Sequence, residues 1–162
     1  MSPRAAWRLE SIGFTRVYDY VAGKADWGSF GLPLEGRRPS VTRVGAHART
    51  DVPACGLHDR MPEVRERVRA AGWDTCFVTN EHGVVLGRLG RAALAGEVDV
   101  SVEEAMTPGP STVRPSLELD RAVERMRAQV LTTLPVTRSD GVLLGVIRLE
   151  DAERALESSA TA

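Results

Sequence analysis

Leu134-Pro-Val-Thr-Arg-Ser-Asp-Gly-Val-Leu-Leu-Gly-Val-Ile-Arg-Leu-Glu-Asp151 is the stretch that decides the fold, because it combines a strand, a turn, a second strand and the start of a helix. Residues 133–137 are rich in β-forming side chains, Arg138–Gly141 ends on the glycine of a hairpin turn, and Val142–Ile147 is an apolar run of strand length. The residues that follow have helical spacing, with acidic side chains in the first turn, where the helix dipole favours them. Asp151 is therefore predicted to lie at the start of a helix that directly follows a strand.

The same pattern occurs once before at a constant offset. This offset places residues 76–89 opposite residues 134–147, with the hairpin glycines in register. Carried upstream, the register pairs Glu66 with Glu124, so a preceding helix repeats as well. Two copies of one helix-strand-strand-helix unit therefore fill most of the chain.

The duplicated unit resembles a CBS domain pair, or Bateman module, from about Pro39 to the C-terminus. The sequence marks of this resemblance are Glu104–Pro108, Ser111–Val113, the helix from Ser116 and the Asp-Gly-Val-Leu-Leu-Gly-Val-Ile run at 140–147. The resemblance implies an α+β fold in which each repeat is a small sheet with helices on one face. It also implies an approximate two-fold axis between the repeats. We divide the chain into an N-terminal segment (1–36), a first repeat (37–100) and a second repeat (101–162).

The resemblance implies a nucleotide site at the second repeat. In the family, the last strand ends in a glycine, two apolar residues, Ser or Thr, two further residues and an aspartate that accepts hydrogen bonds from the ribose hydroxyls. Gly145 and Asp151 fit this signature, but Arg148 stands where the hydroxyl residue is expected. Arg148 either supplies a charge-assisted phosphate contact or obstructs the phosphate position. The implied residues for an adenine nucleotide are Asp151, Arg148, Ile147, Ser111, Thr112, Val113 and Pro135.

Two features limit this interpretation of the site. Asp151 could instead only complement the helix dipole, a role worth about 0.3–1 kcal/mol. In the first repeat the matching positions are Gly90 and Ala93, which carry neither a hydroxyl nor a carboxylate. We therefore expect at most one nucleotide per chain.

Two functions from different classes remain. The first is a regulatory module in which an adenosine-containing ligand biases an equilibrium between two arrangements of the protein. The second is a dimerisation or interaction scaffold whose nucleotide site has decayed. No spacing of a catalytic triad, paired carboxylates, a metal site or a P-loop is present, so we predict neither an enzyme nor a catalytic cofactor. The family usually forms flat homodimers, and the resemblance implies the same here.

The composition fits a compact protein rather than a nucleic-acid or membrane protein. The chain has 162 residues, 43% of them hydrophobic, and a formal net charge of -1. This charge gives no general electrostatic reason to bind nucleic acid or an acidic membrane. No apolar run reaches membrane-spanning length and the N-terminus has no signal-peptide core, so we predict a cytoplasmic protein.

The two cysteines, Cys55 and Cys76, fit no metal pattern or disulfide framework. Both fall in predicted strands, where buried cysteine usually acts as a small hydrophobic residue. The alternative is a redox-sensitive thiol, which requires exposure and a nearby positive charge. The histidines, His47, His58 and His82, are predicted to lie in surface loops or turns rather than in a metal site.

The N-terminal segment is predicted to contain a helix from Ser2 to Gly13, a strand over 15–20 and a short helix over 22–30. Three runs within it, Leu9–Tyr18, Gly23–Trp27 and Gly31–Pro33, resemble the closing part of a rhodanese-type domain. The catalytic cysteine loop of that family lies upstream of this part and is absent here, so we do not expect sulfur transfer.

One strand and two helices cannot bury both faces of the strand, so the segment is expected to dock on the rest of the chain or on a partner. Its aromatic residues are then predicted to be packing residues rather than a recognition surface. These residues are Trp7, Tyr18, Tyr20 and Trp27.

Further elements follow from helical spacing and from helix-ending residues. Glu35–Ser40 is predicted to be a linker, and Val41–Val52 an irregular strand or short helix. The first repeat should contain a helix from Met61 to Gly72, with Met61, Val64, Val68 and Ala71 on its apolar stripe. The second should contain a helix with Ser116 as N-cap and with Leu119, Ala122, Val123, Met126 and Val130 on its stripe.

Overall fold

Residues 41–160 contain two units with the same order of helices and strands. The computed structural model describes residues 3–18, 20, 22–30, 32–33, 41–96 and 100–160, and the predicted linker over 35–40 lies outside them. A 3-10 helix, Val44–Ala46, comes first. The first unit contains β1 (Ala54–Cys55), α3 (Met61–Ala70), β2 (Cys76–Thr79), β3 (Val85–Leu89) and α4 (Arg91–Ala95). Next come α5 (Val102–Ala105), β4 (Thr107–Pro108), α6 (Leu119–Ala128), β5 (Thr133–Thr137), β6 (Leu143–Arg148) and α7 (Leu149–Ala160).

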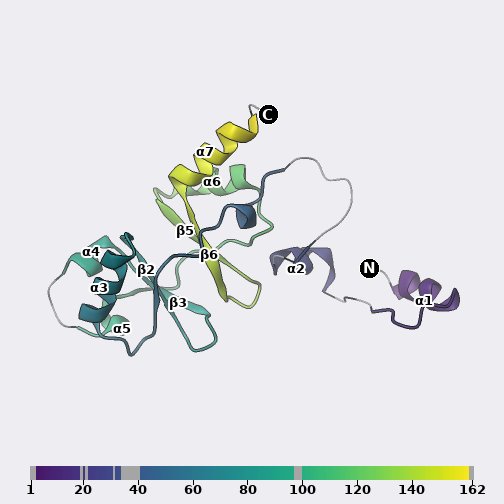
Figure 1. Ribbon diagram of the computed structural model, residues 1–162, viewed down its shortest axis with the longest axis horizontal. Coiled ribbons are helices and arrows are strands. Elements are labelled where there is room, and N and C mark those ends of the chain that lie inside the picture. Colours follow the sequence, from purple (N-terminus) through teal and green to yellow (C-terminus); the bar gives the residue numbers. More distant parts are fainter. Residues whose placement is uncertain are drawn as a thin grey trace.

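Each unit is built on a small sheet with helices beside it. The first sheet has four strands in the order β1-β2-β3-β4, with β2 and β3 antiparallel and β1 parallel to β2. In the second unit β5 and β6 pair antiparallel, and Val113 bridges Val136 in the parallel direction. Figure 1 shows α3 and α4 beside β2 and β3, and α6 and α7 beside β5 and β6. The predicted α+β fold is therefore confirmed.

The two units exchange edge segments. Thr107 in β4 lies on the chain after the first unit, yet it pairs with Arg88 in β3. Arg49 lies on the chain before the first unit, yet it pairs with Val146 in β6 through two backbone hydrogen bonds of 2.9 Å. These two pairings occupy equivalent positions at the offset of the repeat. Main-chain hydrogen bonds therefore join the units in a two-fold arrangement.

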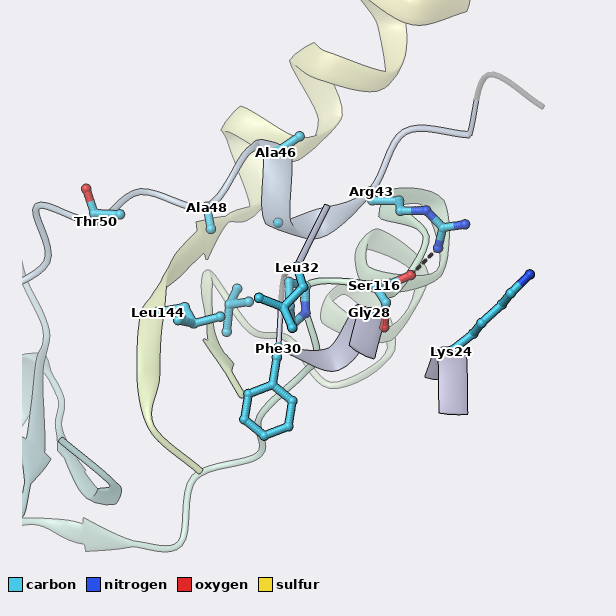
Figure 2. A pocket seen from close by; sticks show the side chains of 13 residues that line it. Lys24, Gly28, Phe30, Leu32, Arg43, Ala46, Ala48, Thr50, Ser116 and Leu144 are labelled. Carbon is cyan, nitrogen blue, oxygen red and sulfur yellow. Dashed lines mark hydrogen bonds between the residues drawn. The ribbon is translucent and has the colours of Figure 1, made fainter. Parts of the chain in front are cut away.

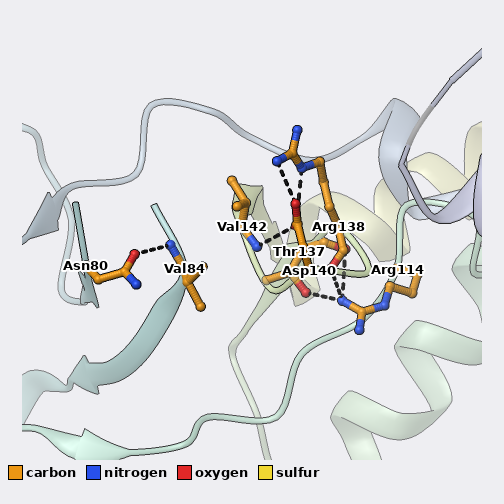
Figure 3. Close-up of polar contacts among 7 residues, drawn as sticks. All are labelled: Asn80, Val84, Arg114, Thr137, Arg138, Asp140 and Val142. Atoms are coloured by element: carbon orange, nitrogen blue, oxygen red, sulfur yellow. Dashed lines mark hydrogen bonds and ion pairs between the residues drawn. The ribbon is translucent and has the colours of Figure 1, made fainter. Parts of the chain in front are cut away.

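The hairpin turns of both units are closed by an acceptor side chain that binds the equivalent N–H groups of Val84 and Val142, although the acceptors stand at different positions of the turn. In Figure 3, Asn80 Oδ1 accepts a hydrogen bond from the Val84 N–H at 2.9 Å. Asp140 Oδ1 accepts one from the Val142 N–H at 3.1 Å. The Arg138 guanidinium, at 2.7 Å from Asp140 Oδ2, lowers the pKa of the Asp140 carboxyl. Such side-chain acceptors close tight turns by replacing a backbone acceptor.

The two hairpin tips also pair with each other. The Leu143 N–H donates to the Gly83 carbonyl at 3.0 Å, and the Val85 N–H donates to the Gly141 carbonyl at 3.1 Å. Gly83 and Gly141 have φ of 76° and 87°, a left-handed conformation that a side chain disfavours. This reciprocal pairing places the hairpin tips at the symmetry axis of the pair.

Each unit has its own hydrophobic core, although the cores touch. The first core contains Met61, Val64 and Val68 of the predicted stripe, and it also receives Val146 from β6 of the second unit. The second core contains Leu119, Ala122, Val123 and Met126, together with Val44 from the segment before the first unit. The exchanged segments are thus part of the packing.

The C-terminal ends of both predicted stripes are wrong. α3 ends at Ala70, so Ala71 is exposed, and α6 ends at Ala128, so Val130 is 90% exposed. Val130 has φ 53°, the left-handed conformation that the equivalent Gly72 adopts with φ 69°. The chain turns at this position, and an apolar side chain there cannot continue the buried face.

The predicted N-cap of α6 is also wrong. α6 begins at Leu119 with Glu118 as an extended N-cap residue that makes no side-chain cap. The reason is tertiary pairing, because Glu118 bridges Arg43 and the Leu117 carbonyl accepts a hydrogen bond from the Val44 N–H at 2.9 Å. The backbone after Ser116 is therefore held extended by the segment that precedes the first unit.

The N-terminal segment contains the two predicted helices, α1 (Pro3–Ser11) and α2 (Gly23–Ser29). The predicted strand over 15–20 is wrong, because residues 15–18 and 20 have no strand pairing. A strand needs a partner for its backbone, and none lies beside these residues in the part of the chain that the structure describes. α2 lies near the second unit, whereas α1 projects away from both units (Figure 1).

The aromatic residues of this segment divide into two groups. Trp7 and Tyr18 are 68% and 83% exposed, so their predicted packing role is wrong for this chain alone. Tyr20 and Trp27 contact each other edge to face, with 5.3 Å between ring centroids. The Arg138 guanidinium carbon lies 5.5 Å from the centre of the Phe30 ring, which links the residue after α2 to the second unit.

Both cysteines are buried and reduced, as predicted for small core residues. Cys55 lies in β1 and Cys76 opens β2, the strand beside it. The contact with the Cys55 thiol and burial raise the pKa of Cys76 above that of a free thiol. Both side chains belong to the first core.

We predict that Val130→Gly stabilises the protein. A valine at positive φ is strained by about 1 kcal/mol, and its exposed side chain has little packing to lose. Chemical denaturation should show a rise of this size in the free energy of unfolding. The matched control is Gly72→Val, which should lower stability by about the same amount. A Val130→Gly variant less stable than the wild type would contradict this account.

We predict that Gly145→Ala destabilises the protein more than Gly87→Ala. A Cβ at Gly145 would lie 2.6 Å from the Arg49 carbonyl oxygen, which the exchanged pairing holds in place. A Cβ at Gly87 would lie 2.4 Å from the Met106 sulfur, which belongs to a flexible side chain that can move. We expect a loss of about 2 kcal/mol at Gly145 and less than about 1 kcal/mol at Gly87. Equal losses in thermal unfolding would argue against a fixed Arg49 backbone.

Candidate functional site

The junction of β6 and α7 presents alternate side chains to different surroundings. Residues along a strand alternate between its two faces. Ile147 faces the core of its own unit and has no exposed surface, whereas Arg148 at the end of β6 is partly exposed. Asp151 follows in the first turn of α7. The strand therefore directs Arg148 away from the core and toward the first unit.

Arg148 contacts Trp73, which comes from the turn after α3. The guanidinium carbon of Arg148 lies 3.8 Å from the centre of the Trp73 ring, which is a stacking distance. Trp73 is 6% exposed, and its side chain contributes, after Arg49, to the lowered pKa of the Asp51 carboxyl. Arg49 approaches the same ring, with its guanidinium carbon 5.2 Å from the centre.

Asp151 is ion-paired and still accessible. Its carboxylate lies 3.3 Å from the Arg154 guanidinium and 4.0 Å from that of Arg49, and 28% of its side-chain surface is exposed. Arg49 also binds Asp51 through two nitrogens, and this contact lowers the pKa of the Asp51 carboxyl. Arg49 therefore links Asp151 to the indole of Trp73.

A hollow of about 390 Å³ opens between the two units at this junction. Its volume falls in the range of sites that hold small molecules, about 300–1,000 Å³. Arg91 and Asp74 form an ion pair of 2.6 Å at this hollow. The lining residues are Gly72, Trp73, Asp74, Arg91, Thr132, Thr133, Arg148, Leu149 and Glu150.

The structure brings together only part of the predicted site. Arg148 lines the hollow and Asp151 lies one helical position beyond its lining residues. Thr112 and Val113 line a different hollow, together with Arg43 and residues of α6. Val113 is buried because it pairs with Val136 at the edge of β5.

The remaining predicted residues are placed as follows. Pro135 and Ile147 are buried in the second unit and do not line the hollow. Ser111 is exposed and does not line the hollow. The exchange of edge segments places Arg49, rather than Ser111–Val113, at the edge of β6 next to Asp151. The approach to Asp151 therefore comes from the start of the first repeat.

The equivalent junction of the first unit lacks the side chains of the signature. Gly90 stands where the second unit has Arg148, and it is the N-cap of α4, which has only five residues. Ala93 stands where the second unit has Asp151. The first unit therefore has no counterpart of Arg148 or of Asp151.

A second, larger hollow of about 710 Å³ lies between α2 and the second unit. Figure 2 shows Phe30 and Leu32 across from Leu144, while Lys24 points away. Arg43 donates to the Ser116 carbonyl at its rim. None of the predicted nucleotide-binding residues lines this hollow.

A comparison of the sequence with family models identifies the second unit. Residues 102–158 match the model described as the CBS domain. The second unit is thus the part of the chain that matches the CBS domain family. The match covers α5 through most of α7, and so includes both Arg148 and Asp151. No curated protein sequence matches the chain.

Solved structures extend the likeness to both units. The cytosolic domain of the Mg²⁺ channel MgtE in complex with ATP has a TM-score of 0.65 and 23% identity, covering 70% of this chain and 48% of that one. This chain thus spans about half the length of that structure. CBSX2 in complex with AMP has a TM-score of 0.66 and 20% identity, covering 73% of this chain and 98% of that one. CBSX2 is a CBS-pair protein from Arabidopsis thaliana.

A third structure is the CBS domain pair of protein MJ0100 in complex with 5′-methylthioadenosine and S-adenosyl-L-methionine. It has a TM-score of 0.66 and 17% identity, covering 74% of this chain and 98% of that one. At these identities the likeness shows the fold, which is that of a CBS domain pair. The first unit therefore has the fold of the CBS domain although only the second matches the family model.

Two further observations on the described residues concern membranes and metals. No helix in the described ranges is long and apolar enough to cross a membrane. Within the same ranges, no group of three or more histidine, cysteine or acidic side chains is arranged to hold a metal ion. His58 and His82 are exposed, as expected for loop and turn residues.

Local sequence patterns did not indicate several residues of the hollow. Trp73 and Asp74 follow a predicted helix and resemble ordinary turn residues. Arg49, which approaches the Trp73 ring without lining the hollow, falls in the least regular part of the chain. The repeat offset does give one signal, because it places Trp73 opposite Leu131. An indole at a position that holds leucine in the other repeat marks a difference between the two junctions.

Proposed function

We propose that the CBS pair is a regulatory module that binds an adenosine-containing ligand in the hollow beside Asp151. The observation that carries this proposal is the partly exposed Asp151 carboxylate at the start of α7, next to a hollow with an arginine and a buried indole. An ionised carboxylate only accepts hydrogen bonds, and the two cis hydroxyls of a ribose offer two donors.

The other groups around the hollow suit a nucleotide. The indole of Trp73 offers a flat surface to a purine base, since aromatic planes stack favourably. Arg148 and Arg49 offer charge-assisted hydrogen bonds to phosphate. Related structures are named as complexes with ATP, with AMP, and with 5′-methylthioadenosine and S-adenosyl-L-methionine, which supports an adenosine-containing ligand as the class.

Regulation in this proposal is a shift between two arrangements of the CBS pair. A ligand shifts such an equilibrium only when it binds one arrangement more tightly than the other. The hollow lies between the two units, so closing it on a ligand would change how they pack. The exchanged segments then transmit the change, because they belong to both units.

We further propose a domain division, an oligomeric state and a role for the N-terminal segment. Residues 37–100 and 101–162 are the two repeats, and the chain pairs with a second copy into a cytoplasmic homodimer. We also propose that residues 1–36 resemble the closing part of a rhodanese-type domain and that the protein acts as a regulator rather than as an enzyme. The exposed Trp7 and Tyr18 favour a role for this segment in contacting a partner.

A second candidate function is a scaffold whose nucleotide site is filled by its own side chains. The observation in its favour is that Trp73 is almost fully buried and is covered by Arg148. In that case the CBS pair would serve as a dimerisation platform.

A thermal-shift panel of AMP, ADP, ATP, S-adenosylmethionine and NADH tests the proposal. A ligand at 100 times its dissociation constant adds about 2.7 kcal/mol to the free energy of unfolding, which should raise the midpoint by several degrees. We expect at least one compound to do so for the wild type and not for Asp151→Ala. Loss of the exposed Asp151 contacts should lower the stability of the ligand-free variant by no more than about 1 kcal/mol, which keeps it testable. No shift with any compound would favour the scaffold.

A further inference from the structure

The stack of Arg148 on Trp73 differs from the other arginine contacts around the hollow. Arg91 pairs with Asp74, and Arg49 pairs with Asp51. The Arg148 side chain makes no ion pair or hydrogen bond with any residue in the described ranges, and its contact is the face of the Trp73 ring. A guanidinium without an anionic partner thus lies on an indole inside the candidate site.

The stack of a guanidinium on an indole is favourable, but a purine base can take the place of the guanidinium. The guanidinium is planar and weakly hydrated, so it stacks well on aromatic rings. A purine base is also planar and stacks on aromatic side chains at a similar separation. The guanidinium and the base would need the same space on the ring, so one must leave when the other binds. The side chain of Arg148 is long and its charged end has no other partner to hold it.

The indole of Trp73 also lies against the loop that carries Arg49 and Asp51. The Arg49 guanidinium carbon is 5.2 Å from the ring centre, and Trp73 contributes to the lowered pKa of the Asp51 carboxyl. The ring itself borders the hollow. Trp73 is therefore held in place from one side while Arg148 covers its face.

We propose that Arg148 is a gate on the nucleotide site. In the ligand-free protein it covers the face of Trp73, and a bound nucleotide displaces it from the ring to its own phosphate. This inference rests on the proposed function, because the base that displaces Arg148 belongs to the same ligand that Asp151 holds. The gate would also make the site prefer nucleotides over nucleosides, because a nucleoside has no phosphate to bind the displaced guanidinium.

The gate predicts opposite effects of Arg148 on nucleosides and on nucleotides. Adenosine must break the stack and gains nothing from the released arginine, so Arg148→Ala should tighten adenosine binding by about five- to thirtyfold. AMP loses its phosphate contact in the same variant, so its affinity should rise less or fall. The preference for AMP over adenosine should therefore shrink in Arg148→Ala. Arg148→Lys keeps the charge but loses the planar stack, so it should tighten both ligands.

The experiment uses the full chain with Trp7→Phe and Trp27→Phe. Of the three tryptophans in the sequence, Trp73 is then the only one that remains. Acrylamide quenching of its fluorescence is measured without ligand, and adenosine and AMP are then titrated by calorimetry. Arg121→Ala is the matched control, since it removes an arginine from an exposed position on α6 outside this hollow. Quenching should increase in Arg148→Ala and remain unchanged in Arg121→Ala.

The outcomes separate the gate from the proposed function. If the wild type binds AMP and Arg148→Ala binds adenosine no more tightly, the gate is wrong and the proposed function stands. If quenching of Trp73 is the same with and without Arg148, the stack is absent in solution and the gate is again wrong. If neither protein binds adenosine or AMP, the proposed function fails and the gate fails with it. Tighter adenosine binding together with increased quenching supports both.

Discussion

Backbone pairing between Arg49 and Val146 is the interaction on which the rest of the structure depends. Its two hydrogen bonds bring a segment from before the first unit to the edge strand of the second. The equivalent pairing of Thr107 with Arg88 does the same in the other direction. Neither sheet is complete without residues from outside its own unit. We therefore expect the two units to fold cooperatively. The close approach of this backbone also explains why position 145 is a glycine.

The same pairing assembles the candidate site. Fixing the Arg49 backbone beside β6 carries its side chain to Asp151, to Asp51 and toward the ring of Trp73. The hollow then combines acidic groups, arginines and one indole, which is the chemistry that a nucleotide requires. When no ligand is present, the arginines make contacts within the protein: Arg49 pairs with Asp51 and Arg148 stacks on Trp73. Binding in such a site is an exchange of internal contacts for ligand contacts, and the balance between them sets the affinity.

Sequence patterns predicted what depends on local periodicity and not what depends on long-range pairing. The duplicated register gave both hairpins, the main helices and the burial of Cys55 and Cys76, because side-chain spacing alone reports these features. It misplaced the start of α6, since Arg43 holds Glu118 in an extended conformation. The family resemblance, rather than the register, joined Ser111–Val113 to Asp151, whereas Thr112 and Val113 line a different hollow in the structure. Trp73 and Arg49, which lie far apart in the chain, could not be predicted as neighbours.

The most direct test of this account is a crystal structure of the protein grown with AMP. We expect the adenine against the ring of Trp73, the ribose hydroxyls on the Asp151 carboxylate, and the Arg148 guanidinium moved from the indole to the phosphate. A structure with AMP bound elsewhere, or with Arg148 still covering Trp73 at saturating AMP, would contradict it.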